Sequence, residues 1–362
     1  MVDIDPRSPV IVGVGQVVER DGDAPSPAEL AATAVGLAAS DAGRRDLAAR
    51  ADVFAAVPIV SWRYGDAAAV VAGLVGATPS LTMYPTVGGN TPQMLVNRVA
   101  EMIASGRADV AVVCGAEAYR TRMAARRQGN RPDWEPQDLA VEPGWTDGDS
   151  VDILHPAETE RGILLPTQGY PLFENALRHD LGRSADDHLR AIAELWAGFS
   201  TVASANPHAW DRVPHDASEI ATPGPDNRMI GAPYTRFMVS NPSVDMASAT
   251  ILCSAGTARD LGIDRDRWVF VHSGSESGDP LMSERRDFTS SPAIATAGRA
   301  ALDAAGIGPD DLDAVDVYSC FPSAVQIACR ELDLPLDRPL TVYGGLSFGG
   351  GPWNNPVGHA IA

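Results

Sequence analysis

The chain has 362 residues, of which 45% are hydrophobic and 21% are charged, values typical of a globular protein and not of a disordered one. Its formal net charge of −19 argues against a nucleic-acid surface or an anionic membrane surface. It holds no run of about 18 apolar residues, and its N-terminal MVDIDPRSPVIVG lacks the features of a signal peptide, so we expect no membrane span and a cytoplasmic protein.

The inventory of reactive side chains excludes several chemistries. No lysine occurs, so Schiff-base catalysis is excluded and arginine must carry any phosphate recognition. The seven histidines show no HExxH spacing and the cysteines form no CxxC pair, so no metal site and no disulfide framework is predicted. The four cysteines are Cys114, Cys253, Cys320 and Cys329.

Strands and helices alternate over the first 90 residues, which predicts an α/β fold. The apolar and alanine-rich runs predict a strand at Pro9 to Val18, a helix from Ser26 to Gly43, a strand at Asp52 to Val60, a helix over 65–75 and a short strand at Leu81 to Val87.

The stretch from Pro85 to Arg120 predicts a Gly-Gly turn, a helix and a buried strand. Asn90 and Thr91 are suitable helix caps, and the apolar run from Val110 to Cys114 is typical of a strand covered on both faces. Gly88 and Gly89 leave room at the helix N-terminus, where free N–H groups favour a negative oxygen. The stretch is therefore either a site for a thioester carbonyl or an ordinary glycine turn.

Residues 121–239 have a different composition, rich in Pro, Gly and Trp, with one clear helix from about Ala185 to Ser204. We interpret this stretch as a lid-like subdomain inserted into the α/β core. Periodic sequence then returns and repeats the early pattern, which suggests two duplicated halves. The later elements are a strand at Val244 to Ser254, a helix over 255–261, a strand at Arg267 to Ser273, a helix from Ser291 to Gly306 and a strand at Asp313 to Ser319.

The tail of the opening stretch, SGRADVAVVCGAEA at 105–118, resembles the segment that follows the nucleophile helix of the thiolase superfamily. Gly115 and Glu117 match the Gly-x-Glu of that family, and Gly89 falls on the position of its nucleophilic cysteine. The resemblance implies a duplicated five-layer αβαβα fold. Its expected parts are an N-terminal half at 1–120 plus 240–262, the inserted subdomain at 121–239 and a C-terminal half at 263–362.

Two further motifs resemble thiolase motifs with their key residues changed. Tyr318-Ser319-Cys320-Phe321 is similar to the His-Asp-Cys-Phe of sterol-carrier-type thiolases, so the resemblance implies an acid/base role for Cys320 with Tyr318 in the histidine position. Without the resemblance, Cys320 is a small buried core residue. Asn355 takes the histidine position of Gly-His-Pro-x-Gly, after a glycine-rich run that contains Gly350. Asparagine can hydrogen-bond an oxyanion but cannot deprotonate a thiol.

The C-terminal half lacks a counterpart of the helix and strands that follow Gly89, so it is expected to be incomplete. We expect the sequence to be a fragment, or a partner or further domain to complete the fold, because missing strands leave sheet edges unpaired. The family also implies a homodimer.

The resemblance implies a protein like those called acetyl-CoA acetyltransferases, which acts on or binds acyl-CoA thioesters and has no covalently bound cofactor. Its expected catalytic residues are Cys320, Tyr318 and Asn355, with Gly89 at the lost nucleophile position, and Gly88, Gly89, Asn90 and Gly350 are expected to bind the thioester. Three hypotheses stay open: an acyltransferase with an altered mechanism, a non-catalytic acyl-CoA-binding module, and a retro-aldolase that cleaves 3-hydroxyacyl-CoA. The third is motivated by Tyr318, because thiolase-fold retro-aldolases resemble this chain in having a tyrosine at the histidine position of the motif. The missing cysteine is no objection to it, because a retro-aldolase needs no covalent intermediate.

Overall fold

The computed structural model describes residues 4–147 and 154–362. The chain divides into two compact units. Unit 1 consists of residues 1–150, 242–274 and 352–362, and unit 2 consists of residues 151–241 and 275–351. The sequence analysis predicts a different division, into two homologous halves at 1–120 with 240–262 and at 263–362, and an insertion at 121–239. That division stays a prediction.

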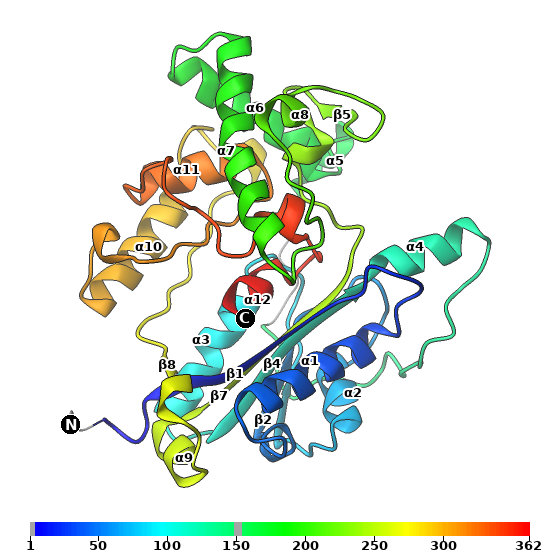
Figure 1. Ribbon diagram of the computed structural model, residues 1–362, viewed down its shortest axis with the longest axis vertical. Helices are drawn as coiled ribbons and strands as arrows, with labels where there is room; N and C mark the ends of the chain where they lie inside the picture. The colour runs from blue at the N-terminus through cyan, green and yellow to red at the C-terminus, as the bar shows by residue number, and fades with distance from the viewer. Residues whose placement is uncertain (1–3, 148–153) are drawn as a thin grey trace. The chain divides into compact units, whose positions relative to one another are not determined.

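Unit 1 is built on one six-stranded sheet with the order β3-β2-β4-β7-β1-β8 (Figure 1). β7 lies antiparallel between β4 and β1, whereas β2 pairs in parallel with β3 and β4. Every residue of β4 and β7 is buried, as a sheet covered on both faces requires. The strands are β1 (Pro9–Val18), β2 (Val53–Ala56), β3 (Leu81–Met83), β4 (Val110–Ala118), β7 (Asp245–Ser254) and β8 (Val269–Phe270).

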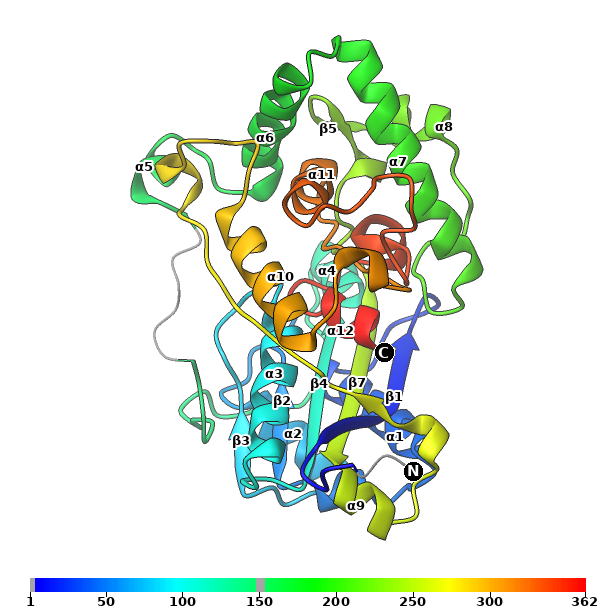
Figure 2. The same cartoon turned by 90° about the vertical axis from the view of Figure 1, so that its left-hand side faces the viewer.

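Helices cover both faces of this sheet (Figure 2). α1 (Pro27–Asp41) and α2 (Ala67–Leu74) pack on the face that carries Val112 and Ile251. α3 (Thr91–Ala104) packs on the face that carries Val113 and Leu252, and α12 (Pro356–Ile361) also contacts α3. The alternation of neighbouring residues between the two cores is the two-residue period of a strand. α4 (Tyr119–Arg127) and α9 (Ala255–Asp260) complete the helices of unit 1.

The start of α1 shows how the sequence specifies these elements. The Ser26 hydroxyl caps the helix by accepting a hydrogen bond from the Glu29 N–H, and the Glu29 carboxylate accepts one from the Ser26 N–H. Small residues then let α1 approach β1 closely, because a Cβ on Gly13 or Gly15 would collide with carbonyl oxygens of the helix. The alanine-rich run is therefore a packing surface as well as a helix former.

Unit 2 is mainly helical, and a two-stranded ribbon is the only sheet among its described residues. The predicted helix over 185–204 is confirmed as α7, but residues 121–239 hold more helices than that one. The elements of unit 2 are α5 (Pro156–Glu160), α6 (Pro166–Asp180), α7 (Ala185–Ala205), α8 (Ala217–Ala221), β5 (Met229–Gly231), β6 (Tyr234–Thr235), α10 (Pro292–Ala305), α11 (Pro322–Glu331) and a π-helical turn, η6 (Gly345–Gly349).

Four predicted strands are wrong in extent or in kind. The strands expected at Asp52 to Val60, Leu81 to Val87 and Arg267 to Ser273 shorten to β2, β3 and β8. The segment from Asp313 to Ser319 forms no strand. That segment makes one backbone bond, from the Val317 N–H to the Leu340 carbonyl oxygen, and no ladder with any described residue. An apolar run becomes a strand only where a neighbour pairs with it.

Candidate active-site region

The glycine turn before α3 is held by an asparagine from the far end of the sequence. The Gly88 N–H donates to Oδ1 of Asn354 at 3.0 Å, and Nδ2 of Asn354 donates to the carbonyl oxygen of Pro58 at 3.0 Å. Gly89 is half-buried within this turn, and Asn90 is the N-cap residue of α3 without a side-chain cap bond. The turn is therefore fixed by Asn354, whereas its predicted role in thioester binding stays a prediction.

Asn355, in the predicted histidine position, is a buried structural residue of unit 1. Its Nδ2 donates to the Gly115 carbonyl oxygen at 2.9 Å and lies 3.0 Å from Oγ of Ser248. A Cβ on Gly115 or Gly358 would collide with the Asn355 side chain, so both glycines are needed for its close fit. With both amide hydrogens facing protein acceptors, Asn355 takes no proton from a nucleophile.

The other two candidates for thiol chemistry in unit 1 are also buried in the protein interior. His359 is buried, and its Nδ1 lies 2.8 Å from Oε1 of Gln16, so the ring contacts a side chain of β1. Cys114 is 1% exposed in the middle of β4, and burial raises the pKa of its thiol to about 12. Unit 1 thus offers no activated thiol among its described residues.

Cys320 lies in unit 2, directly before the start of α11. Its thiol is buried next to Tyr170, which hydrogen-bonds to it, and burial raises the pKa of Cys320 to about 11. Phe321 stacks on Tyr170 with ring centroids 4.2 Å apart. A thiol in this environment is protonated at neutral pH, so Cys320 is suited to donate a proton and not to attack as a thiolate.

Besides Tyr234, three tyrosines interact electrostatically with Cys320, and two of them were missed by sequence reasoning. Tyr318 was predicted, whereas Tyr170 comes from α6 and Tyr343 directly precedes the glycine-rich run, neither within a motif. Desolvation is the main cause that raises the pKa of Tyr318 and Tyr343, and Cys320 is the main cause for Tyr170, so all three phenols are protonated at neutral pH. The Tyr343 hydroxyl is buried and has no hydrogen-bond partner among the described residues, although a buried phenol usually has one.

The glycine-rich run packs directly against the Cys320 motif. Oγ of Ser319 accepts a hydrogen bond of 3.1 Å from the Leu346 N–H, and a Cβ on Gly345 would meet that hydroxyl. Gly344 and Gly350 have φ angles of 105° and 113°, a region that glycine adopts readily. Gly350 therefore has a backbone reason to be glycine, and its predicted role in thioester binding stays a prediction.

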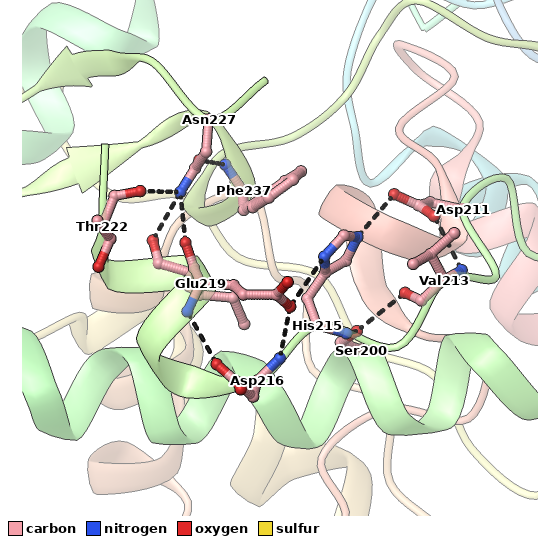
Figure 3. Close-up of polar contacts among 10 residues, drawn as sticks. Ser200, Asp211, Val213, His215, Asp216, Glu219, Thr222, Asn227 and Phe237 are labelled. Atoms are coloured by element: carbon pink, nitrogen blue, oxygen red, sulfur yellow. Dashed lines mark hydrogen bonds and ion pairs between the residues drawn. The ribbon is translucent and has the colours of Figure 1, made fainter. Parts of the chain in front are cut away.

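A polar cluster around His215 also contacts the glycine-rich run (Figure 3). The Asp211 N–H donates to the Phe348 carbonyl oxygen at 2.8 Å. Figure 3 shows the His215 ring between Asp211 and Glu219, at 3.3 Å and 3.6 Å from their carboxylates. The same ring packs on Phe237 with centroids 4.3 Å apart. Residues 211–219 therefore hold the glycine-rich run in place.

A cavity of about 350 Å³ in unit 2 adjoins the Cys320 motif. Tyr170 and Tyr318 both contribute to its wall, and apolar side chains of α10 and α11 make much of the remainder. Its polar side holds Arg285 paired with Asp279, at 2.5 Å. The cavity thus combines an apolar lining with two phenol donors, the composition of a small-molecule site.

A buried polar network around Glu174 joins α6, α7 and α11. The Glu174 carboxylate accepts from Tyr234 at 2.8 Å and from Gln326 at 2.7 Å, and it lies 2.6 Å from Nε2 of His188. Tyr234 continues to Ser323 in the first turn of α11, at 2.9 Å. Three side chains therefore fix one carboxylate and, with Ser323, tie α6 and α7 to the helix that follows Cys320.

The described residues hold no group of three or more His, Cys, Asp or Glu side chains that could bind a metal ion. Among the same residues, no helix is long and apolar enough to cross a membrane.

No family model matches the chain, but individual proteins of known sequence or structure are similar to it. A monomeric SCP2-thiolase-like protein type 1 from Mycobacterium smegmatis is 34% identical with a TM-score of 0.83, over 99% of this chain and 71% of that protein. An acetyl-CoA acetyltransferase from Methanothermobacter thermautotrophicus is 32% identical over 48% of this chain and 43% of its own length. The steroid 3-ketoacyl-CoA thiolase FadA6 from Mycobacterium tuberculosis is 29% identical over 44% of this chain and 38% of its own length.

The sheet and these similarities define a protein with a thiolase-like α/β fold, and the chain belongs to the thiolase superfamily. Its similarity over 99% of its length is to the SCP2-thiolase-like type. The chain spans less than half the length of the two curated relatives described above. An Ltp2-ChsH2(DUF35) aldolase shares the fold, with 18% identity and a TM-score of 0.74 over 98% of this chain and 89% of that one.

Proposed function

We propose that the chain binds an acyl-CoA thioester and acts on it by proton transfer, without a covalent acyl-enzyme. The observation that carries this proposal is the group of three protonated phenols around Cys320, whose own pKa is raised to about 11. A thiolase needs a thiolate and a histidine that activates it, whereas Gly89 and the fully engaged Asn355 occupy those positions here.

Retro-aldol cleavage of a 3-hydroxyacyl-CoA is the reaction that these residues serve best. We assign the base to Asp279, the acidic side chain in the cavity wall. Its carboxylate takes the proton of the 3-hydroxyl, the C2–C3 bond breaks, and a ketone or aldehyde leaves. The electron pair of that bond forms the thioester enolate, which is protonated at C2 to give a shortened acyl-CoA. Neutral phenols stabilise the enolate oxygen by hydrogen bonds and supply the proton, and Tyr343 has an unused buried donor.

The test follows the release of the shortened acyl-CoA from a 3-hydroxyacyl-CoA. Tyr318→Phe should lower the rate by about 100-fold or more, the usual contribution of a positioned acid or base. Tyr119→Phe is the matched control, because Tyr119 packs against Trp353 and does not line the cavity. Unchanged cleavage by Tyr318→Phe would remove this reaction from consideration.

A second candidate, a non-catalytic acyl-CoA-binding module, is favoured by the loss of both thiolase catalytic residues. Acyl-CoA binding without turnover of any 3-hydroxyacyl-CoA would support it. Thiolysis of acetoacetyl-CoA by free CoA, abolished by Cys320→Ala and not by Cys329→Ala, would instead support the acyltransferase hypothesis and contradict a non-covalent mechanism. Cys329 is the control because it is an equally buried thiol, on α11.

The predicted partners are also proposals. A homodimer follows from the family resemblance, but the Mycobacterium smegmatis relative is described as monomeric. The name of the Ltp2-ChsH2(DUF35) aldolase joins two components, which makes a second chain or domain the partner to look for. Sedimentation of the purified chain, alone and with such a partner, distinguishes these arrangements. Localisation in the cytoplasm likewise stays a prediction.

A further inference from the structure

A cavity of about 340 Å³ in unit 1 has a wall that consists largely of arginine side chains. It belongs to neither the Cys320 motif nor the turn before α3. Its arginines come from the loop after β2, from α4 and from the segment after α4. The lining residues are Trp62, Arg63, Arg122, Arg126, Asn130, Arg131 and Pro132, and none of them is acidic.

The Gly-x-Glu motif fixes the loop that carries this wall. The buried Glu117 carboxylate accepts hydrogen bonds of 2.7 Å from the backbone N–H groups of Val60 and Ser61. The next residue is Trp62, whose indole N–H donates to the Glu135 carbonyl oxygen at 3.1 Å. The wall is therefore set before any ligand arrives, which lowers the entropy cost of binding.

Two of the arginines are held in place by uncharged groups. Nη1 of Arg122 donates to the Val60 carbonyl oxygen at 2.8 Å, and the Arg131 guanidinium lies 4.4 Å from the centre of the Trp62 ring. A cation over an aromatic ring is stabilised by the ring's electron-rich face without losing its charge. Both contacts order the guanidinium groups and leave a net positive cavity.

Three of the four arginines have no carboxylate partner. Arg63, Arg126 and Arg131 take part in no ion pair with a described residue. Arg122 alone interacts with a carboxyl group: burial raises the pKa of Glu117 to about 7, and the charge of Arg122 opposes that rise. The Glu135 carboxylate accepts from the hydroxyls of Ser26 and Tyr64. The chain has 47 acidic residues and 28 basic ones, so a cavity lined by four arginines and no acidic residue is unusual for its composition.

We propose that this arginine cavity is a binding site for a phosphate-bearing small molecule with two or more negative charges. Guanidinium groups match phosphate oxygens in pairs, and in this lysine-free chain arginine is the residue that recognises phosphate. The phosphate comes from a free di- or polyphosphate or from the nucleotide end of a larger molecule such as CoA. Binding at this site is independent of any reaction at Cys320.

Calorimetric titration of the whole chain tests the proposal with three probes: pyrophosphate, adenosine 3′,5′-bisphosphate and CoA. At least one probe should bind, and Arg126→Gln should weaken its binding about tenfold, the loss of one charge-assisted hydrogen bond. Arg127→Gln is the matched control, because Arg127 follows on the same helix, changes net charge equally and does not line the cavity. Its affinity should stay within about twofold of the wild type.

The pattern among probes identifies the source of the phosphate. Tight binding of pyrophosphate indicates a free phosphate ligand, whereas binding of the bisphosphate and CoA alone indicates a nucleotide end. Absence of binding by all three probes at millimolar concentration overturns the proposal. Equal weakening by Arg126→Gln and Arg127→Gln also overturns it, because that result reports general charge attraction and not a site. Arg131→Gln, at an exposed side chain, repeats the test independently of α4.

Discussion

The side-chain amide of Asn355 donates a 2.9 Å hydrogen bond to the carbonyl oxygen of Gly115. Two motifs that are far apart in the sequence, the Gly-x-Glu of β4 and the asparagine before α12, are thereby joined inside unit 1. The position that resembles a catalytic histidine has become a structural contact, and the glycine opposite it is needed for space.

Gly115→Ala should therefore lower the free energy of unfolding. A methyl group at this position collides with the buried Asn355 side chain, and overpacking of this kind costs about 1–3 kcal/mol. Urea denaturation measures the change. Gly36→Ala is the control: Gly36 lies exposed in α1 with open space around it, so alanine there should stabilise the protein slightly. Equal stability of Gly115→Ala and the wild type would contradict the tight fit.

Glu117 predicts an unusual pH dependence of stability. Burial raises its pKa to about 7 in the folded chain, from the ordinary glutamate value of 4.5. Between those values the folded state binds more protons than the unfolded state, so this group's contribution is full below pH 4.5 and is lost as pH rises to 7. The loss is at most about 3 kcal/mol.

The measurement compares the wild type with Glu117→Gln in denaturant melts at several pH values. The wild type should lose stability relative to this variant as pH rises from 5 to 8. Glu101→Gln, at an exposed position on α3, should show no such trend. A wild type that gains stability relative to Glu117→Gln as pH rises would show that the folded pKa is lowered and not raised.

The cysteines should be unreactive in the native protein. Burial raises the pKa of Cys320 and Cys329 to about 11 and of Cys114 and Cys253 to about 12. Only a small fraction of any thiol is ionised at pH 8, and the thiolate is the reacting form. Ellman's reagent should therefore report slow labelling in buffer and rapid labelling of all four thiols in denaturant. A fast-reacting thiol that disappears in Cys320→Ala would contradict this prediction and favour nucleophilic chemistry.

The Glu174 network predicts a large stability effect at His188. His188→Ala removes the closest partner of a fully buried carboxylate, and breaking such a pair costs about 3–5 kcal/mol. His179→Ala on α6 is the control, because His179 is exposed and makes no such contact. Thermal melts followed by circular dichroism compare the two variants. A similar midpoint for both would show that the buried Glu174 carboxyl does not depend on His188.

Strong periodicity made unit 1 predictable from its sequence. The helix at Thr91–Ala104 and the fully buried strand at Val110–Ala118 have unmixed patterns, because one is amphipathic and the other apolar throughout. Asp313 to Ser319 has a more mixed pattern, with two aspartates among its apolar residues, and it forms no strand. Strand pairing also depends on a partner segment that a local pattern does not specify.

The candidate site was predictable only where a motif carried it. Cys320 and Tyr318 were found because four consecutive residues resemble a family motif. Tyr170 and Tyr343 come from segments without such a motif, and their closeness to Cys320 arises from tertiary packing. Three arginines of the cavity in unit 1, Arg122, Arg126 and Arg131, lie close together in the sequence. The Trp62 loop that completes the wall is more than 50 residues earlier, so the sequence did not predict the cavity.

The strand order of unit 1 also sets the order of events during synthesis on the ribosome. β1 ends at Val18, and its long antiparallel partner β7 begins only at Asp245. At translation rates of about 5–20 residues per second, β1 spends many seconds without that partner while the intervening chain emerges. Closing so long a loop is slow, so a nascent chain halted before Asp245 exposes the apolar edges of β1 and β4 to aggregation. Truncations that remove β7 should accumulate as insoluble protein even when every residue of β1 to β4 is present.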